Sequence, residues 1–395
     1  MTQQHVWLKM LLLFTLTLCA GILIGFSEIP ATQPRTASKQ VVYNAKAVLE
    51  QITLQEPMRH ENLTLYMLSA PDEMDTSDVI TLEHAMEIGK LKVIETSNVN
   101  KLAVVNESDK TVFIHAGDIV RGGKQDRTLA HDMLIPPKSD PIPVDSFCVE
   151  SGRWAQREGE STSYFSRSKN MLNDNDAILN ARLRKSQQGV WRSVKNVQSR
   201  VGAALETDVQ APASLSSLQL TLENQELNDA AKLYANALRA AATRYPDTRG
   251  FIACINGEVY VAHLYASHKL LIDIWHKQLN ALAAEAISQS ANKKEFEQAK
   301  PEAALVFIEQ FDGIKGNAEI IDKAMTLHQY HTKTAVLLES ITQDTNACLH
   351  ASFLLKPKHF DKAAHEPPQQ MMIQRRNATI PTPSPQSHSE QSPQQ

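Results

Sequence analysis

Glycines and charged side chains gather in the stretch from Gly117 to Arg127 (GDIVRGGKQDR), which holds three glycines and five charged residues in eleven positions. Paired glycines let backbone N–H groups come close to a ligand, and neighbouring Lys and Arg side chains favour an anionic one. The pattern therefore predicts an anion-binding turn, in which Asp126 is also available as a base. The expected ligand-binding residues are Gly122, Gly123, Lys124, Gln125 and Arg127.

A Walker-type phosphate-binding loop is excluded for this stretch. That pattern requires Gly, four residues of any type, and then Gly-Lys-Ser/Thr. Here Gly123 intervenes before Lys124, and Gln125 stands where the hydroxyl residue is needed. The other interpretation, which the sequence leaves open, is a tight or bulged turn between two strands with solvated charges.

A second group of reactive side chains lies at residues 147–154 (FCVESGRW). If a strand runs through Glu150, the side chains of Cys148 and Glu150 project from the same face, because strand side chains alternate. Arg153 and Trp154 follow just beyond a glycine turn. This arrangement predicts a cysteine nucleophile, a carboxylate base or an arginine that clamps an anion. The alternative is that Cys148 is a small buried hydrophobic residue and Glu150 pairs structurally with Arg153.

Other sequence patterns that carry chemistry are missing. The chain contains no H-E-x-x-H, C-x-x-C, G-x-S-x-G or G-x-G-x-x-G motif. His328 and His331 are three residues apart on an expected helix, but no Glu or Cys accompanies them. A solvated helix face is therefore favoured over a metal site. The sequence predicts no metal ligands and does not reveal whether a cofactor binds.

The composition excludes several classes of protein. The 395 residues include 40 Lys and Arg against 44 Asp and Glu, a formal net charge of −4, with 21% charged and 42% hydrophobic residues. These values are ordinary for soluble domains, so a polytopic membrane protein, a collagen-like chain and a wholly disordered chain are excluded. The near-neutral balance argues against a nucleic-acid partner, because dedicated nucleic-acid-binding domains are typically basic. Four cysteines are too few to staple the fold with disulfides.

The two ends of the chain differ from its middle. Residues 1–27, apolar from Met10 to Phe26 (MLLLFTLTLCAGILIGF), have the pattern of a signal peptide, and their length also suits an N-terminal membrane anchor. We therefore expect export to the periplasm or cell envelope, with anchoring to the inner membrane by this segment as the alternative. Residues 28–40 are predicted to be a linker, and residues 359–395 a disordered tail rich in Pro, Gln and Ser. The folded body is then a single domain over residues 41–358.

The first part of the body is expected to be rich in antiparallel strands. Short apolar and β-branched runs are separated there by polar turn residues. The expected strands cover residues 48–54, 63–68, 91–95, 101–106, 111–115, 127–135 and 142–149. A short helix is expected at residues 82–88, with Thr81 as N-cap and Gly89 as its left-handed end.

The middle of the body has helical spacing, and the last part returns to strands. Helices are expected at residues 175–205, 223–244 and 268–288. Asn256-Gly257 lies between two apolar runs and indicates a hairpin, because both central positions of a type I′ turn need positive φ. The fold class is therefore α+β, with an N-terminal β-rich part, central helices and β-hairpins near 251–262 and 335–355.

Several of these segments, taken together, resemble a known family. The order GDIV, GGKQDR, PPKS and FCVESGRW resembles the ARPP-type domain, the ARG and rhodanese-phosphatase-superfamily-associated protein domain of bacteria and archaea. Supporting matches are Leu82-Glu83-His84-Ala85, Glu95-Thr96, Asn100, Asn106, Ser186 to Trp191, and the Gly257 hairpin followed by Trp275. The resemblance covers about residues 45–290 and extends towards 355. Two positions depart from the family's pattern: Ser151, where His or Gln is common, and Arg121, where a small or aliphatic residue is usual.

What the resemblance implies about function is limited to association. The family's name refers to the genomic association of its members with ADP-ribosylglycohydrolase and phosphatase-like proteins, and the name specifies no reaction. This genomic association implies an anionic, phosphate-bearing ligand next to Lys124, Arg127 and Arg153.

Two functional hypotheses follow from the sequence. The first is a binding module, exported or tethered to the membrane by its N-terminus, that takes an anionic ligand or a partner at residues 117–154. The alternative is a hydrolase or transferase acting on a phosphate-bearing, nucleotide-derived substrate, with Glu150 or Asp126 as base and Cys148 as nucleophile. Both require five side chains to converge around one pocket: Lys124, Asp126, Cys148, Glu150 and Arg153. The sequence specifies no oligomeric state.

Overall fold

The computed structural model describes residues 40–96, 98–290, 296 and 298–360. The predicted export segment, nearly all of the predicted linker, and the predicted tail from residue 361 lie outside these residues. Within the described part of the chain, no helix is long and apolar enough to cross a membrane. The α+β prediction is confirmed, because helices and largely antiparallel sheets both contribute substantially.

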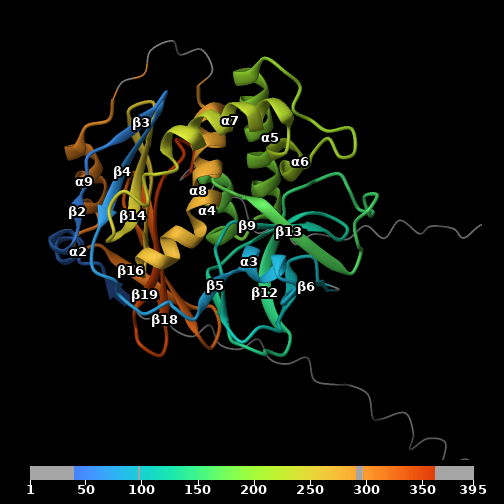
Figure 1. The fold of residues 1–395 in the computed structure, drawn as a ribbon, viewed down its shortest axis with the longest axis horizontal. Helices are drawn as coiled ribbons and strands as arrows, with labels where there is room; N and C mark the ends of the chain where they lie inside the picture. Colours follow the sequence, from blue (N-terminus) through green and yellow to red (C-terminus); the bar gives the residue numbers. More distant parts are fainter. Residues whose placement is uncertain (1–39, 97, 291–295, 297, 361–395) are drawn as a thin grey trace, which may run out of the picture.

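A large ten-stranded antiparallel sheet forms one side of the molecule (Figure 1). Its strands, in spatial order, are β1 (Gln40–Val42), β16 (Lys315–Ile320), β17 (Met325–His331), β18 (Ala335–Thr342), β19 (Cys348–Leu355), β15 (Glu258–Tyr265), β14 (Thr248–Ile255), β4 (Leu63–Ser69) and β2 (Thr53–Leu54), with β3 (Met58–His60) also paired to β4. The chain leaves this sheet after Ser69 and returns to it at Thr248. The neighbouring strands β4 and β14 are buried along their whole length because both faces of the sheet are covered.

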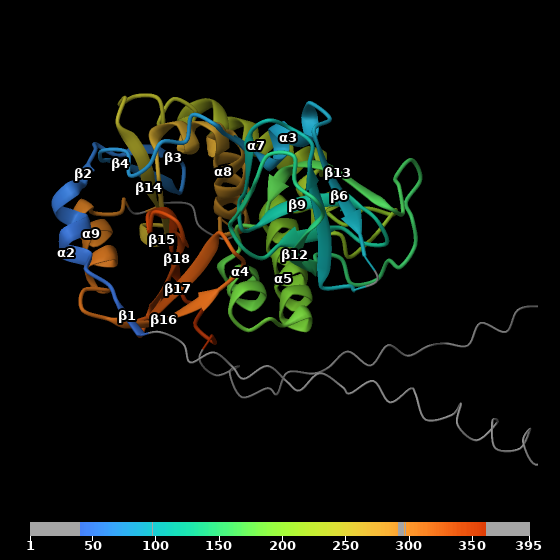
Figure 2. The same ribbon diagram turned by 90° about the horizontal axis from the view of Figure 1, so that it is seen from below.

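A closed six-stranded barrel lies beside the large sheet and is made entirely from the intervening chain (Figure 2). Its strands, in order around the barrel, are β10 (Arg127–Leu129), β12 (Ile142–Cys148), β7 (Lys101–Asn106), β6 (Leu91–Glu95), β13 (Tyr164–Met171) and β9 (Asp118–Gly122). A small sheet accompanies it, in the order β11 (Met133–Ile135), β8 (Thr111–Ile114) and β5 (Val79–Thr81). The short helix α3 (Leu82–Glu87) begins at Thr81, whose hydroxyl accepts a hydrogen bond from the His84 amide, as the sequence predicted.

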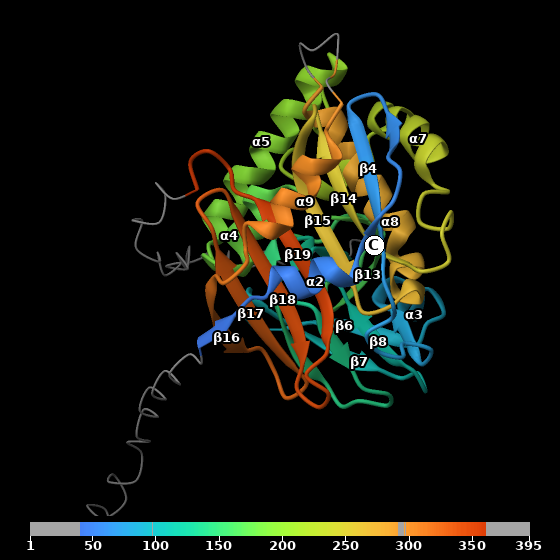
Figure 3. The ribbon, with the colours of Figure 1, turned by 90° about the vertical axis from the view of Figure 1, so that its left-hand side faces the viewer.

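Helices cover both faces of the large sheet. On the outer face lie α2 (Ala45–Gln51) and α9 (Pro301–Glu309), visible in front of the sheet in Figure 3. On the inner face α8 (His268–Ser288) packs against β14 and also against β13 of the barrel. Around it are α4 (Asn175–Arg182), α5 (Gln187–Leu205), α6 (Leu218–Leu222) and α7 (Gln225–Leu238). Because α8 is enclosed by the sheet, the barrel and these helices, most of it is buried, and one stripe that includes Asp273 and His276 stays exposed.

The strongest local signals of the sequence are confirmed. Helix 268–288 has the predicted bounds. The Asn256-Gly257 turn joins β14 to β15 with φ values of 54° and 83°, as a type I′ turn requires. The second predicted hairpin is formed by β18 and β19.

Five predicted elements are wrong in type or extent. The first residues of the predicted strand 48–54 form α2, which is capped by the Asn44 side chain at the amide of Ala47. The expected helix 175–205 is two helices, because Lys185 takes a left-handed φ of 50° and Ser186 caps a new helix at the Gly189 amide. The expected helix 223–244 starts at Gln225 and ends at Leu238.

The other two corrections concern strands. His328 and His331 lie on strand β17, not on a helix. The predicted strand 127–135 is divided between β10, which belongs to the barrel, and β11, which belongs to the small sheet. The residues between these two strands, including Asp132, are thereby free to turn towards the large sheet.

Candidate functional site

The glycine turn of residues 117–127 connects two neighbouring barrel strands, β9 and β10. Gly122 and Gly123 have φ values of 113° and 56°, so both occupy the region that favours glycine. A Cβ atom on Gly123 would lie 2.6 Å from Phe165 Cζ and 2.8 Å from Glu95 Oε2. Gly123 is therefore required by close packing against neighbouring protein atoms.

Asp126 and Glu150 are brought together behind this turn, where two arginines meet them. Arg153 Nε lies 2.9 Å from Glu150 Oε1, and Arg157 Nη2 lies 2.6 Å from Asp126 Oδ1. Glu160 also accepts from Arg157, at 2.8 Å. We call these five residues the acid–arginine cluster. The two inner carboxylates are completely buried and each has an arginine partner, so the cluster stabilises the turn.

Hydrogen bonds tie the acid–arginine cluster to the backbone. Asp126 Oδ1 accepts from the Gly122 amide at 3.0 Å, and Glu150 Oε2 accepts from the Asp126 amide at 3.2 Å. The Gln125 side chain donates to the Glu150 carbonyl at 2.8 Å. Burial raises the pKa of Asp126, the Arg157 guanidinium opposes this shift, and the Glu150 carboxylate adds to it. Asp126 is therefore the carboxyl of the cluster that holds a proton more readily than usual.

Cys148 and Arg127 face the interior of the barrel. The Cys148 side chain is buried, and burial raises the pKa of its thiol to about 11. The Gln187 amide pairs with the Cys148 backbone in both directions, at 2.8 and 2.7 Å. Arg127 is 1% exposed and donates to the Gln125 carbonyl at 2.7 Å, with Glu95 at 3.7 Å.

Lys124 and Trp154 lie on the surface, outside the acid–arginine cluster. Trp154 is 51% exposed. Lys124 is exposed and makes no ion pair or side-chain hydrogen bond with the described residues. The predicted residues therefore occupy three layers. The acid–arginine cluster joins Asp126, Glu150 and Arg153 beside Gly122, Gly123 and Gln125; Cys148 and Arg127 lie below it, and Lys124 and Trp154 lie outside it.

A groove of about 900 Å³ opens next to the cluster, between β13, α7 and α8. Arg121 connects the two features, since its guanidinium reaches Glu160 of the cluster at 3.8 Å and Glu223 of the groove at 2.7 Å. Five cationic side chains line the groove: Arg121, Arg167, Lys169, Lys232 and Arg239. Glu223 is the one carboxylate among the lining residues. The lining residues therefore carry an excess of positive charge, which carboxylates beside the groove partly offset.

The cations of the groove differ in how they are paired. Arg167 contacts Glu83 at 3.2 Å, and Lys232 contacts Asp229 at 2.7 Å. Lys169 and Arg239 are exposed and have no side-chain partner among residues that the structure describes. Between the cations the wall is apolar, formed mainly by Leu222, Leu227, Ala231, Trp275 and Leu279.

The sequence analysis missed this groove because its wall combines three separate segments. The signals that could have revealed it are the spacing of Lys232 and Arg239 along one helix, and of Trp275 and Leu279 along another. At seven and four residues apart, each pair shares a helix face. Which faces meet is decided by the packing of α7 against α8.

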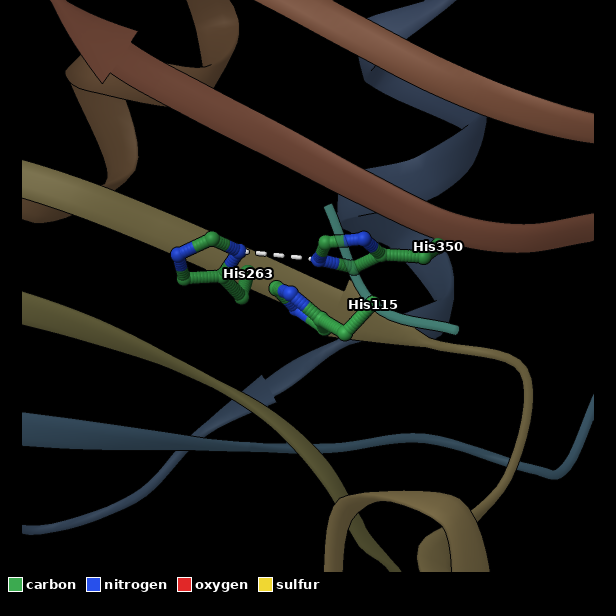
Figure 4. A group of neighbouring side chains, drawn as sticks. All are labelled: His115, His263 and His350. Carbon is green, nitrogen blue, oxygen red and sulfur yellow. Dashed lines mark hydrogen bonds between the residues drawn. The ribbon is translucent and has the colours of Figure 1, made fainter. Parts of the chain in front are cut away.

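One further group of side chains could hold a metal ion. Within the described ranges, three buried histidines, His115, His263 and His350, each offer a ligand atom, and these atoms lie within 4.8 Å of one another (Figure 4). The sequence prediction did not include them, because they come from a turn and two strands that are distant along the chain.

Comparison with known proteins identifies one family. The family model described as "ARG and Rhodanese-Phosphatase-superfamily-associated Protein domain" matches residues 51–354, which is most of the chain. No match was found among curated proteins or among solved structures.

Proposed function

Because the chain belongs to the ARG and Rhodanese-Phosphatase-superfamily-associated Protein domain family, we propose that it is a binding module for a small anionic ligand. The ligand class is phosphate-bearing and nucleotide-derived, such as ADP-ribose, and the site is the groove between β13, α7 and α8. One observation carries the proposal: five cationic side chains and a single carboxylate line this groove. Arg121 lines the groove and also belongs to residues 117–154, so it joins the groove to that region.

The charge distribution supports an anionic ligand of mixed character. Lys169 and Arg239 have no partner among the described residues, so their charges are available to a phosphate group without breaking an existing ion pair. The apolar wall around Leu227 and Leu279 suits a base or another flat ring. A volume of about 900 Å³ lies in the range of sites that hold small molecules.

The surroundings of the predicted catalytic residues favour a binding function over catalysis. Glu150 and Asp126 are paired with arginines and completely buried, and a substrate at the surface has no direct approach to them. The thiol of Cys148 has a pKa of about 11, so its reactive thiolate is scarce at neutral pH. The enzyme alternative is tested by incubating wild type and Glu150→Gln with ADP-ribosyl and sugar-phosphate compounds. Turnover that Glu150→Gln abolishes, with ligand binding retained, would replace the binding module by an enzyme.

The binding proposal is tested by calorimetric titration of the protein with ADP-ribose. We expect Lys169→Ala and Arg239→Ala each to weaken binding about tenfold, because each removes a charged hydrogen-bond donor. Lys195→Ala is the matched control, since Lys195 is an exposed lysine on α5 outside the groove, and it should bind as wild type does. The Lys124→Ala variant distinguishes binding in the groove from binding at the glycine turn. If Lys124→Ala alone weakens binding, the turn is the site; if wild type binds no phosphate-bearing compound, the proposal fails.

We also propose that the protein is exported, through the apolar segment of residues 10–26. The support is the sequence pattern, a positively charged start followed by an apolar run. Mass analysis of the protein from its native host tests this. A mature chain starting near Thr32 indicates cleavage, an intact Met1 in the membrane fraction indicates an anchor, and an intact soluble chain contradicts both.

A further inference from the structure

Three histidines meet at the junction between the large sheet and the barrel, as Figure 4 shows. His115 lies in the turn between β8 and β9, His263 on β15 and His350 on β19. All three side chains are at most 3% exposed. We propose that these residues, which we call the histidine cluster, bind a divalent transition-metal ion, Zn²⁺ by ligand chemistry. The proposal does not depend on the anion-binding groove.

The donor atoms have nearly the spacing that zinc requires. Zn–N bonds of about 2.0–2.1 Å place the donors of a tetrahedral site about 3.3–3.4 Å apart. His263 Nδ1 and His350 Nε2 are 2.9 Å apart, and Ser352 Oγ is 3.3 Å from each of them. An oxygen donor is therefore already beside the pair. The His115 donor is within 4.8 Å of the others, so it has to approach by at most about 1.5 Å.

The register of the large sheet explains why two of the ligands face each other. His263 on β15 is paired with Ser352 on β19, and Tyr265 is paired with His350. Side chains two residues apart on a strand share a face, so these four side chains project from the same face of the sheet. That face is turned towards the barrel, where His115 completes the set.

The neighbours of the histidine cluster fix which ring nitrogen carries the proton in two of the histidines. His350 Nδ1 lies 3.1 Å from Asp132 Oδ2, and His115 Nδ1 lies 2.6 Å from the Ala116 carbonyl. Both partners are acceptors, so each of these Nδ1 atoms carries the proton. The Nε2 of His115 contacts Tyr265 Oη at 3.1 Å and Gln278 Nε2 at 3.2 Å, and a metal ion would displace these two contacts. A carboxylate that orients a histidine in this way is the usual second layer of a zinc site.

Asp132 is held as a carboxylate by several donors. Ser340 Oγ and Arg182 Nη2 lie 2.6 and 3.3 Å from its Oδ2, and the Ala116 amide donates to its Oδ1 at 2.8 Å. The charge of Asp132 thus offsets part of the positive charge that a metal ion brings.

The donor set consists of three imidazoles that come from three separate segments of the chain. Neutral imidazoles without a thiolate suit Zn²⁺. Such an ion would cross-link the barrel turn at His115 to two strands of the large sheet, which is a structural role. The competing arrangement is metal-free, with His263 Nδ1 donating to His350 Nε2.

The wild-type protein decides between these two arrangements without any variant. The full chain is treated with chelator, incubated with Zn²⁺ or Co²⁺, desalted, and analysed for metal by mass spectrometry. We expect one tightly bound ion per chain, visible absorption bands of tetrahedral Co²⁺, and a rise in Tm that chelator reverses. A protein that retains no metal and keeps the same Tm overturns the proposal.

Single substitutions then locate the ion. We expect His263→Gln and His350→Gln to lose stoichiometric Co²⁺ binding, and Asp132→Asn to lower zinc affinity about 10–100-fold. His84→Gln is the control, because His84 is exposed and lies outside the histidine cluster. Retention of the Co²⁺ spectrum by folded His263→Gln or His350→Gln places the metal elsewhere and contradicts the assignment. If these variants unfold, the wild-type titration still stands as the deciding measurement.

Discussion

Lys277 Nζ on helix α8 lies 2.6 Å from Asp118 Oδ1 on barrel strand β9, and both side chains are about 95% buried. The other oxygen of Asp118 accepts a hydrogen bond from the His115 amide at 3.0 Å. This ion pair therefore fastens the central helix to the barrel at the edge of the histidine cluster. Removing one partner of a buried pair leaves the other charge uncompensated.

We expect Lys277→Met to lower the free energy of unfolding by about 3–5 kcal/mol. The double variant Lys277→Met with Asp118→Asn should recover part of this loss, because no unpaired charge remains. Urea unfolding followed by circular dichroism measures both. Lys101→Met is the control, since its partner Asp145 is at the same 2.6 Å but both side chains are exposed. Equal losses in Lys277→Met and Lys101→Met would contradict the buried pair.

Gly123→Ala should destabilise the fold by about 1–3 kcal/mol, through its left-handed backbone and its lack of space. A methyl group there would meet Phe165 and Glu95 at less than 3 Å. Gly159→Ala is the matched comparison, because Gly159 also has a positive φ of 80° but nothing within 4 Å of its Cβ position. The midpoint of urea unfolding should fall further for Gly123→Ala than for Gly159→Ala. The reverse order would show that the turn opens to admit a side chain.

Glu285 gives a prediction about pH. Burial and the nearby Asp174 carboxylate raise the pKa of Glu285 from its ordinary 4.5 to about 7, against the opposing effect of Arg200. The folded state therefore binds an extra proton between about pH 4.5 and 7. The stabilising contribution is complete below pH 4.5 and is lost as the pH rises towards 7, at up to about 1.4 kcal/mol per pH unit.

Unfolding by urea at pH 5.5 and pH 8 tests this prediction for Glu285. We expect Glu285→Gln to lose less stability between these two pH values than wild type does. Glu258→Gln, at an exposed position, should behave as wild type. A pH dependence that is the same in Glu285→Gln and wild type would show that other groups cause it.

Cys148 should be protected from thiol reagents in the folded protein. With a pKa of about 11, its thiolate fraction at pH 8 is about one in a thousand, and the side chain is buried. Labelling with an aromatic disulfide, followed by peptide mapping, should therefore modify Cys148 and the equally buried Cys254 at the same slow rate, set by unfolding. Rapid modification of Cys148 alone would support the prediction that Cys148 is a nucleophile.

Local signals explain which parts of the fold were predictable. The Asn256-Gly257 turn and helix 268–288 are specified by neighbouring residues, and both are confirmed. The strand 127–135 was predicted as one element because its apolar run is continuous. Its division between two sheets depends on partners far along the chain, since β10 pairs with β12 and β11 with β8. A single sequence does not state those partners.

The candidate sites show the same distinction. Of the five side chains that had to converge, the structure joins Asp126, Glu150 and Arg153, because the two motifs occupy paired strands of one barrel. It does not join Lys124, which is exposed, or Cys148, which is buried below the cluster. The histidine cluster was not predicted, because its members have no shared motif. His263 and Tyr265 are two residues apart, as are His350 and Ser352, so each pair shares one face of its strand. This spacing indicates a common site only when β15 and β19 are known to be neighbours.

The excursion of the chain between Ser69 and Thr248 has a consequence for the order of folding. All six barrel strands lie within residues 91–171, so their pairing closes shorter loops than the pairing of β4 with β14 does. The large sheet instead joins β4 to β14 across the whole excursion, and it acquires β18 and β19 last during synthesis. The barrel can therefore form on the ribosome before its host sheet exists. Helix α8 then joins the barrel through Lys277 and Asp118, and His350, near the end of the described chain, adds its contact with Asp132 last.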